Sequence, residues 1–312
     1  TYQSLSDTGA LNWIPQGSIL GPLLFLIYVN DMPFAIDNCD LRLYADDTCI
    51  LYTGNNIEEI EKNLNSDFNK LCDWFIDNKL SIHFGEDKTK CIMFSEKNSS
   101  SKDLIIKRNE NNIKQHRTVE YLGTLLDDNM SGESMALKVL SKINQKIKFL
   151  YRQRKYLSPS LRRMLCNSLI QPHFDFACVS WFPNLPAKLK KKIQTAQNQY
   201  IRYWLNLEHF EKINWLPVQN RVDQCIAVTA FNFKKSRCPL YMSDIFVNND
   251  GPAVNTRRSI NSLIEPHYRK KCPRNSLSYL GPRIWNNLEK DIKNSVSTNS
   301  FKHALKRKYF KN

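Results

Sequence analysis

The first 130 residues alternate short apolar runs with turn residues, a pattern that mixes helices with short strands. Apolar residues fill positions 23–29 directly after a Gly-Pro pair, which predicts a helix because a first helical turn tolerates proline. Residues 57–75 repeat apolar side chains every three or four positions, which predicts a second helix, capped by Asn56 with Glu59 as its capping-box partner. Runs typical of strands follow at 80–84, at 91–94 and, as two more short strands, near 119–125. This half is therefore predicted to be α+β.

From Ser134 onward the apolar spacing becomes helical, and three successive helices are predicted. Their apolar stripes consist of Leu137, Leu140, Ile143, Ile147 and Leu150, then Leu161, Leu165 and Leu169, then Leu189, Ile193, Ala196, Tyr200 and Trp204. Residues 208–312 are less regular and richer in proline, and they contain one late amphipathic helix from Phe301 to Phe310.

Two adjacent acids stand between two apolar runs, at Tyr44-Ala45-Asp46-Asp47. The runs at 41–43 and 49–52 predict a strand, a tight turn and a second strand, with both acids at the tip. Adjacent carboxylates repel each other unless a cation neutralises them, and Mg²⁺ or Mn²⁺ favours carboxylate oxygens. Turns also favour aspartate for backbone reasons alone, so the pair by itself leaves a plain turn open.

Charge is distributed unevenly along the 312 residues, whose net charge is +15. Residues 1–130 contain 12 Lys and Arg against 20 Asp and Glu, whereas residues 131–312 contain 33 against 10. An acidic part joined to a strongly basic part predicts a polyanionic partner, namely nucleic acid; a merely soluble basic surface is the alternative. The candidate nucleic-acid-binding residues are Lys138, Lys142, Lys146, Lys190, Lys191 and Lys192.

The nine cysteines are scattered, without a CxxC pair or zinc spacing, which predicts reduced thiols and a nuclear or cytoplasmic location. No apolar run approaches the roughly 20 residues that span a bilayer, so we expect no membrane partner. The N-terminus has neither an initiator Met nor a signal peptide, and the sequence is interpreted as a fragment. The pattern leaves the oligomeric state open.

Two ordered motifs are the most specific feature of the sequence. The run 14–25, which contains Pro15-Gln16-Gly17, and the 44–47 motif resemble the reverse transcriptases of non-LTR (LINE-type) retrotransposons, above all the jockey-like branch. Weaker similarities follow in order at Trp74, 78–84, 88–90, 121–123, 156–158, Trp181 and 279–288. The resemblance extends over about residues 14–312.

This resemblance implies a partial right-hand polymerase with an α+β palm. Its parts would be a leader outside the family (1–13), a partial palm of antiparallel hairpins and helices (14–130), an α-helical thumb (131–207) and a basic C-terminal region (208–312). The implied activity is that of an RNA-directed DNA polymerase, a nucleotidyltransferase of a mobile element. It would copy an RNA template from a DNA primer or target, using deoxynucleoside triphosphates and two metal ions, Mg²⁺ or Mn²⁺.

The resemblance also implies residue roles. Asp46 and Asp47 would be the catalytic, metal-binding acids. Gln16, Gly17, Tyr44 and Lys88 would contact the nucleotide or template, and Tyr121, Leu122 and Gly123 would lie on the primer side. Lys88 is equally well explained as a turn residue at a strand end. Core packing explains Tyr121 and Leu122 about as well as primer contact does.

The sequence departs from the family upstream of the first motif. Family members carry an earlier aspartate on an apolar strand, whereas Asp7, the only acid before Ile14, lies in no such strand. Trp13 stands where the family usually has glycine, and the fingers region is not seen. We therefore expect little or no polymerase activity from this chain alone. The alternative is a non-catalytic, nucleic-acid-binding remnant of a retrotransposon protein.

Overall fold

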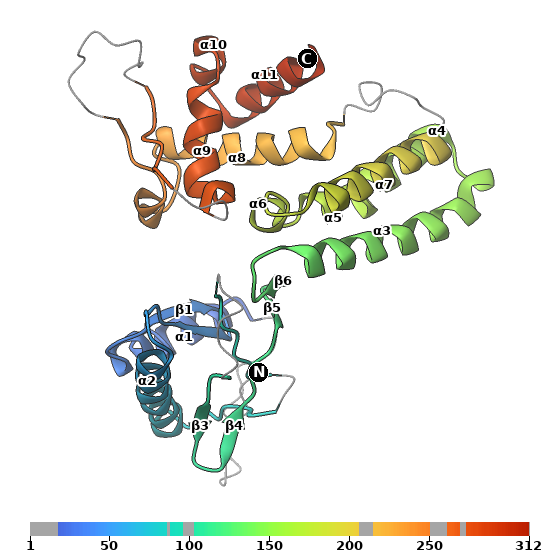
Figure 1. Cartoon of the computed structure of the whole chain (residues 1–312). Coiled ribbons are helices and arrows are strands. Elements are labelled where there is room, and N and C mark those ends of the chain that lie inside the picture. Colours follow the sequence, from blue (N-terminus) through green and yellow to red (C-terminus); the bar gives the residue numbers. More distant parts are fainter. Residues whose placement is uncertain are drawn as a thin grey trace. The chain divides into compact units, whose positions relative to one another are not determined.

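The computed structural model describes residues 18–85, 88–95, 103–205, 215–249, 261–268 and 273–311. The chain divides into two compact units, Thr1–Asn129 and Met130–Asn312, which Figure 1 colours along the sequence. All the named strands lie in the first unit, and the second is built from helices over its described residues. The predicted α+β class is confirmed at this level.

The first unit combines two helices with three antiparallel hairpins. Its elements are α1 (Gly21–Tyr28), a 3₁₀ turn η1 (Met32–Ala35), β1 (Asp40–Tyr44), β2 (Asp47–Leu51), α2 (Ile57–Asp77), β3 (Ile106–Arg108), β4 (Asn111–Ile113), β5 (Thr118–Tyr121) and β6 (Thr124–Asp127). Each hairpin is a separate two-stranded sheet, pairing β1 with β2, β3 with β4 and β5 with β6. The predicted helices at 23–29 and 57–75 and the hairpin around 44–47 are confirmed.

Helix α2 supplies the central packing face of this unit. It begins after Asn56, whose side chain accepts a hydrogen bond from the backbone N–H of Glu58. Glu59, the expected capping-box partner, accepts a hydrogen bond from the hydroxyl of Tyr52 at 2.9 Å. The buried apolar residues of α2 are Phe68, Leu71, Cys72 and Phe75. They pack against α1 and η1 at one end and against the β3–β4 hairpin at the other.

The strands predicted at 80–84 and 91–94 are wrong, because neither segment forms a regular strand. Ile82 and Phe84 pack on the apolar cluster around Phe68, and Cys91 makes an isolated parallel bridge with Gln115. Alternating apolar residues indicate which side chains are buried. Those side chains can be buried against a helix, without pairing to a neighbouring strand.

The second unit is a succession of helices. Its elements are α3 (Glu133–Gln153), η2 (Arg154–Tyr156), α4 (Pro159–Leu169), α5 (Gln171–Asp175), α6 (Cys178–Trp181), α7 (Ala187–Leu205), α8 (Val218–Lys234), η4 (Leu240–Asp244), η5 (Pro273–Asn275), α9 (Leu277–Asn286), α10 (Lys290–Lys293) and α11 (Thr298–Lys311). The three helices predicted from Ser134 onward and the late helix at 301–310 are confirmed. Helix α8 was not predicted.

The apolar stripes of these helices differ in detail from the expectation. On α3 the buried residues are Met135, Ala136, Val139, Ile143 and Leu150, whereas Leu137 is exposed. On α4 Cys166 is buried, and Leu161 is exposed. The inward face of each helix is therefore shifted by a residue or two from the stripe of large aliphatic side chains, because small and sulfur-containing residues also pack inward.

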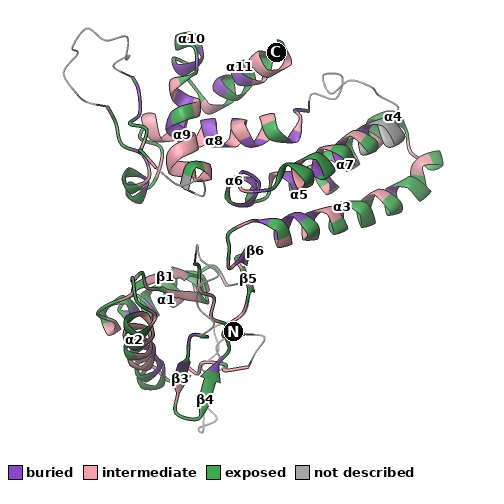
Figure 2. Cartoon of the chain, viewed as in Figure 1, coloured by how far each residue is buried: buried purple, intermediate pink, exposed green. Residues whose placement is uncertain are grey.

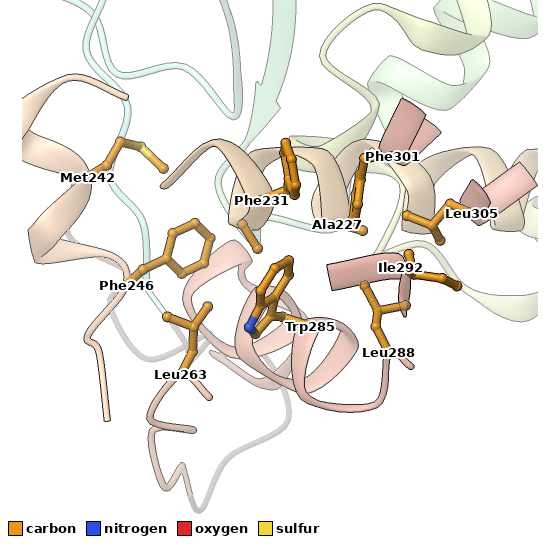
Figure 3. Packing of buried hydrophobic residues seen from close by; sticks show 11 residues of the cluster. Ala227, Phe231, Met242, Phe246, Leu263, Trp285, Leu288, Ile292, Phe301 and Leu305 are labelled. Atoms are coloured by element: carbon orange, nitrogen blue, oxygen red, sulfur yellow. The ribbon is translucent and has the colours of Figure 1, made fainter. Parts of the chain in front are cut away.

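Helices α8, α9, α10 and α11 share one apolar core, shown in Figure 3. The rings of Phe231 and Phe301 stack with centroids 4.4 Å apart, and Trp285 is fully buried beside them. The indole N–H of Trp285 donates to the carbonyl of Asn261 at 2.9 Å, so its polar atom is satisfied. Within the described residues, none of the helices is both long enough and apolar enough to cross a bilayer.

Candidate active site

The adjacent acids lie at the tip of the β1–β2 hairpin. Tyr44 pairs with Asp47, so Ala45 and Asp46 form a two-residue turn between the strands. Ala45 adopts a left-handed backbone with φ of 51°, a conformation that hairpin turns require but that favours glycine. Both aspartates are exposed. The sequence prediction of a hairpin tip is confirmed.

Strand register gives the hairpin two different faces. Leu41, Leu43 and Ile50 pack against the cluster that α2 forms with α1 and η1. Successive side chains of a strand point to opposite faces, and the cross-strand partners are Arg42 with Cys49 and Tyr44 with Asp47. The opposite face therefore carries Arg42, Tyr44, Asp47 and Cys49. The apolar pattern of the two strands fixes the side from which Asp47 projects.

Tyr121, at the end of β5, lies within electrostatic range of this polar face. Burial raises the pKa of the Tyr121 phenol above its usual value, and the charges of Cys49 and Asp47 raise it further, while Arg42 lowers it. Leu122 and Gly123 make the two-residue turn of the β5–β6 hairpin, with φ of 47° and 78°. The charged residues of the β1–β2 hairpin therefore lie near enough to Tyr121 to influence its pKa.

A buried carboxylate holds the start of β1. Asp67 of α2 is fully buried and accepts hydrogen bonds from the backbone N–H groups of Asn38 at 2.6 Å and Cys39 at 2.8 Å. The side-chain amide of Asn38 donates to it at 3.1 Å. Burial acts to raise the pKa of Asp67, but these hydrogen bonds outweigh it and leave the pKa below its usual value.

The sequence interpretation did not include Asp67 among the functional candidates. Its position offered a signal, because it stands three residues after Leu64 and four before Leu71, on the apolar face of α2. An acid in such a stripe predicts a buried, hydrogen-bonded carboxylate. Arg42 and Cys49 were also missed, although alternation along β1 and β2 places them on the face of Asp47.

The remaining predicted residues of this unit are more peripheral. Tyr44 is 65% exposed. Lys88 is exposed in a turn, where its N–H donates to the carbonyl of Gly85 at 2.9 Å; its role beside a nucleotide stays a prediction. Gln16 and Gly17 lie outside the described residues.

In the second unit the predicted lysines differ in their surroundings. Lys142, Lys146, Lys191 and Lys192 are exposed, and Lys138 is half-buried. Lys190 instead packs inward. Its ammonium donates to the carbonyl of Pro183 at 2.9 Å and lies 5.4 Å from the ring centroid of Phe182. In this structure Lys190 thus ties α7 to the segment before it.

Comparison with known proteins relates the first unit of the chain to a described protein family. Residues 4–126 match the family described as "Reverse transcriptase (RNA-dependent DNA polymerase)". The chain is similar to the reverse transcriptases of non-LTR retrotransposons. Residues 4–126 are called the reverse-transcriptase segment below, and both the Asp46-Asp47 hairpin and Tyr121 lie within it.

Three curated relatives illustrate the similarity. The "Probable RNA-directed DNA polymerase from transposon X-element" of Drosophila melanogaster is 24% identical over 204 residues, which cover 63% of this chain and 22% of that protein. The "Retrovirus-related Pol polyprotein from type-1 retrotransposable element R1 2" of Nasonia vitripennis is 26% identical over 199 residues, 61% of this chain and 48% of that protein. The "RNA-directed DNA polymerase from mobile element jockey" of Drosophila melanogaster is 24% identical over 169 residues, 51% and 18% respectively.

The chain therefore spans less than half the length of these reverse-transcriptase relatives. No solved structure matches the chain.

Reverse transcriptases generally use divalent metal ions, and the donor chemistry at the hairpin tip fits such an ion. Exposed carboxylates are hard oxygen donors, and Mg²⁺ is commonly held by one or two of them together with water and substrate phosphates. Across the described part of the chain, no group of three or more His, Cys, Asp or Glu side chains could hold a metal ion. Asp46 and Asp47 supply two exposed carboxylates at this tip.

Proposed function

We propose that this chain carries part of the polymerase site of an RNA-directed DNA polymerase, in which Asp46 and Asp47 hold a divalent metal ion, Mg²⁺ or Mn²⁺. The observation that carries the proposal is the position of both exposed carboxylates at a hairpin tip inside the reverse-transcriptase segment. In this proposal residues 14–130 are a partial palm, residues 131–207 a helical thumb and residues 208–312 a basic C-terminal region. An RNA template, a DNA primer or target and deoxynucleoside triphosphates are the partners.

The reaction is nucleotidyl transfer. The primer 3′-hydroxyl attacks the α-phosphorus of the nucleotide and pyrophosphate leaves. A bound divalent ion lowers the pKa of the hydroxyl and offsets the charge of the triphosphate.

The residues of the chain position these groups. Asp46 and Asp47 supply the carboxylates, Asp67 fixes the entry of β1, and Tyr121 lies within range of the charge of Asp47. In the same proposal Gln16, Gly17 and Tyr44 contact the nucleotide or template. Lys88 provides a cation for the leaving pyrophosphate.

The test begins with metal binding, which needs no turnover. Mn²⁺ binding, followed by electron paramagnetic resonance, is expected to weaken by about tenfold or more in Asp46→Asn and in Asp47→Asn, because each loses one charged ligand. Asp77→Asn is the matched control, since Asp77 is an exposed acid of the same unit on helix α2, outside the hairpin itself. Equal Mn²⁺ affinity in the wild-type chain and both hairpin variants would contradict the metal assignment.

Primer extension tests the chemistry. Any extension on an RNA template with Mg²⁺ is expected to fall to background in Asp46→Ala, while Asp77→Asn extends as the wild-type chain does. Extension that persists in Asp46→Ala would contradict the catalytic role.

The second candidate function is nucleic-acid binding without catalysis. One observation favours it: between Glu133 and Asp175 the chain has nine Lys and Arg residues and no acid. This function predicts binding that falls steeply with salt and does not change in Asp46→Ala. The two functions are therefore separated by the response of metal binding and extension to the hairpin variants.

A further inference from the structure

An acid-free cationic stretch of the second unit lies on one helical hairpin. Helix α3, the turn η2 and helix α4 together cover residues 133–169, and the nine Lys and Arg residues between Glu133 and Asp175 all lie on them. An ordinary soluble surface intersperses both signs of charge. Apart from Glu133 at its first residue, this hairpin carries a single sign of charge, which is suited to a polyanion.

Three aromatic side chains are exposed where α3 ends. Phe149 is 57% exposed, Tyr151 56% and Tyr156 83%. A single exposed aromatic residue is ordinary on a protein surface. Here three fall within eight residues, and they alternate with the cations Lys148, Arg152, Arg154 and Lys155. Residues Lys148–Tyr156 are called the α3 tip below.

The helix geometry fixes how the tip presents these groups. Leu150 is buried and anchors α3 to its inner side, where the helix packs against α7. At about 100° per residue, Phe149 and Tyr151 project on either side of Leu150, and Lys148 and Arg152 lie between them on the outer face. Lys148 and Arg152 are both exposed. Much of the α3 ribbon has the colour of exposed residues in Figure 2.

The chain then turns back through η2, which displays Tyr156. The turn is closed by the N–H of Leu157, which donates to the carbonyl of Arg154, and Ser158 caps the following helix α4. Capping and a Pro at the start of α4 make this turn a defined structural feature. Tyr156 is thus displayed from a defined turn, where it is 83% exposed.

We propose that the α3 tip binds single-stranded nucleic acid, with its aromatic rings stacking on unpaired bases and its cations contacting the phosphates. Every base has a π face, so exposed rings bind single strands with little sequence preference, and cations track the backbone. The bases of a duplex are already stacked on each other and cannot accept these rings. Charge complementarity selects this occupant over an apolar protein partner. The inference rests on the proposed function, because it names the form of nucleic acid that the basic unit engages.

Binding to a fluorescein-labelled 15-nucleotide oligothymidine and to a duplex of the same length, measured by fluorescence anisotropy, tests the proposal. The triple variant Phe149→Ala, Tyr151→Ala, Tyr156→Ala is expected to lose about tenfold or more in single-strand affinity. It should keep the salt dependence of binding, since its cations are unchanged. The matched control replaces two exposed aromatic residues elsewhere in the same unit, Phe176→Ala and Tyr241→Ala, and is expected to bind as the wild-type chain does.

A second variant separates loss of stacking from loss of folding. Replacing Phe149, Tyr151 and Tyr156 by Trp keeps the stacking surface, so single-strand binding should be retained. The proposal is overturned if the triple alanine variant binds the oligothymidine as tightly as the wild-type chain. It is also overturned if the wild-type chain binds the duplex as tightly as the single strand.

The result of the single-strand binding test does not depend on Asp46 and Asp47, the acids of the β1–β2 hairpin. Asp46→Asn is expected to leave oligothymidine binding unchanged. Metal-dependent extension without a single-strand preference would remove only the inference about the α3 tip. Conversely, stacking-dependent binding by a chain whose Mn²⁺ affinity ignores Asp46 and Asp47 would remove only the proposed polymerase site.

Discussion

The carboxylate of Asp67 accepts a hydrogen bond from the backbone N–H of Cys39, one residue before β1 begins, at 2.8 Å. The same carboxylate oxygen accepts from the N–H of Asn38. A single side chain in the middle of α2 therefore satisfies two donors of the chain segment that leads into the acidic hairpin. These two hydrogen bonds to Asp67 are called the clamp below. Because β1 starts immediately after the clamp, Asp67 helps to position the hairpin tip that carries Asp46 and Asp47.

Removing the clamp is expected to destabilise the first unit. Asp67→Ala leaves two backbone donors without their acceptor and should lower the free energy of unfolding by about 2–3 kcal/mol. Urea unfolding measures the loss, and faster amide exchange in peptides covering residues 38–51 would locate it. Asp77→Asn, an exposed acid at the end of the same helix, should change stability by less than about 0.5 kcal/mol. Unchanged exchange at 38–51 in Asp67→Ala would show that the clamp does not hold the hairpin.

The clamp also predicts a pH dependence. The pKa of Asp67 is lower in the folded chain than its ordinary value of 3.8, so the folded state favours the ionised carboxylate. Its contribution is complete above about pH 5 and is lost as the pH falls through the folded pKa. Asp67→Asn lacks this component, and its stability should therefore fall less between pH 5 and pH 3 than that of the wild-type chain. Parallel stability curves over that range, measured by urea unfolding, would contradict the assignment.

Local pattern and turn chemistry were sufficient to predict the hairpin that carries the candidate site. The alternating apolar residues of β1 and β2 and the short Ala-Asp link between them specify both the strands and the exposed tip. Likewise, Asn56 and the regular apolar spacing after it specify α2. These features depend on neighbours within a few residues, so one sequence is enough to read them.

The wrong or missing predictions concern residues whose structure depends on contacts with distant parts of the chain. Apolar residues at 80–84 and 91–94 suggested strands, but their burial is satisfied by α2 rather than by strand partners. Helix α8 was missed because much of its inward face consists of small and medium residues that carry little periodic signal. Asp67 was missed as a clamp because its partners lie about 28 residues earlier in the chain.

The turn at the acidic tip offers a test of backbone strain. Ala45 has a φ of 51°, where glycine meets no steric penalty and a β-branched residue is a pronounced outlier. Ala45→Gly should change the free energy of unfolding by less than about 1 kcal/mol, because relief of strain offsets the added freedom of the unfolded chain. Ala45→Val should destabilise the hairpin by more than Ala45→Gly does. Thermal unfolding compares the two, and equal stability of both variants would argue against a left-handed Ala45.

The proximity of Tyr121 to the acidic hairpin can be measured directly. Burial, together with the negative charges of Cys49 and Asp47, raises the pKa of the Tyr121 phenol. Asp47→Asn removes one of these charges, and the pKa should therefore fall part of the way toward the usual value near 10, while the effect of burial remains. Carbon-13 tyrosine labelling with NMR detection resolves the phenol, and the signal that disappears in Tyr121→Phe assigns it.

Asp77→Asn supplies the control for this titration, since it removes a charge from the same unit without altering the hairpin. Its Tyr121 signal should titrate as in the wild-type chain. If Asp47→Asn also leaves the pKa of Tyr121 unchanged, the two hairpins do not face each other in solution. The candidate site would then reduce to the tip of the β1–β2 hairpin alone.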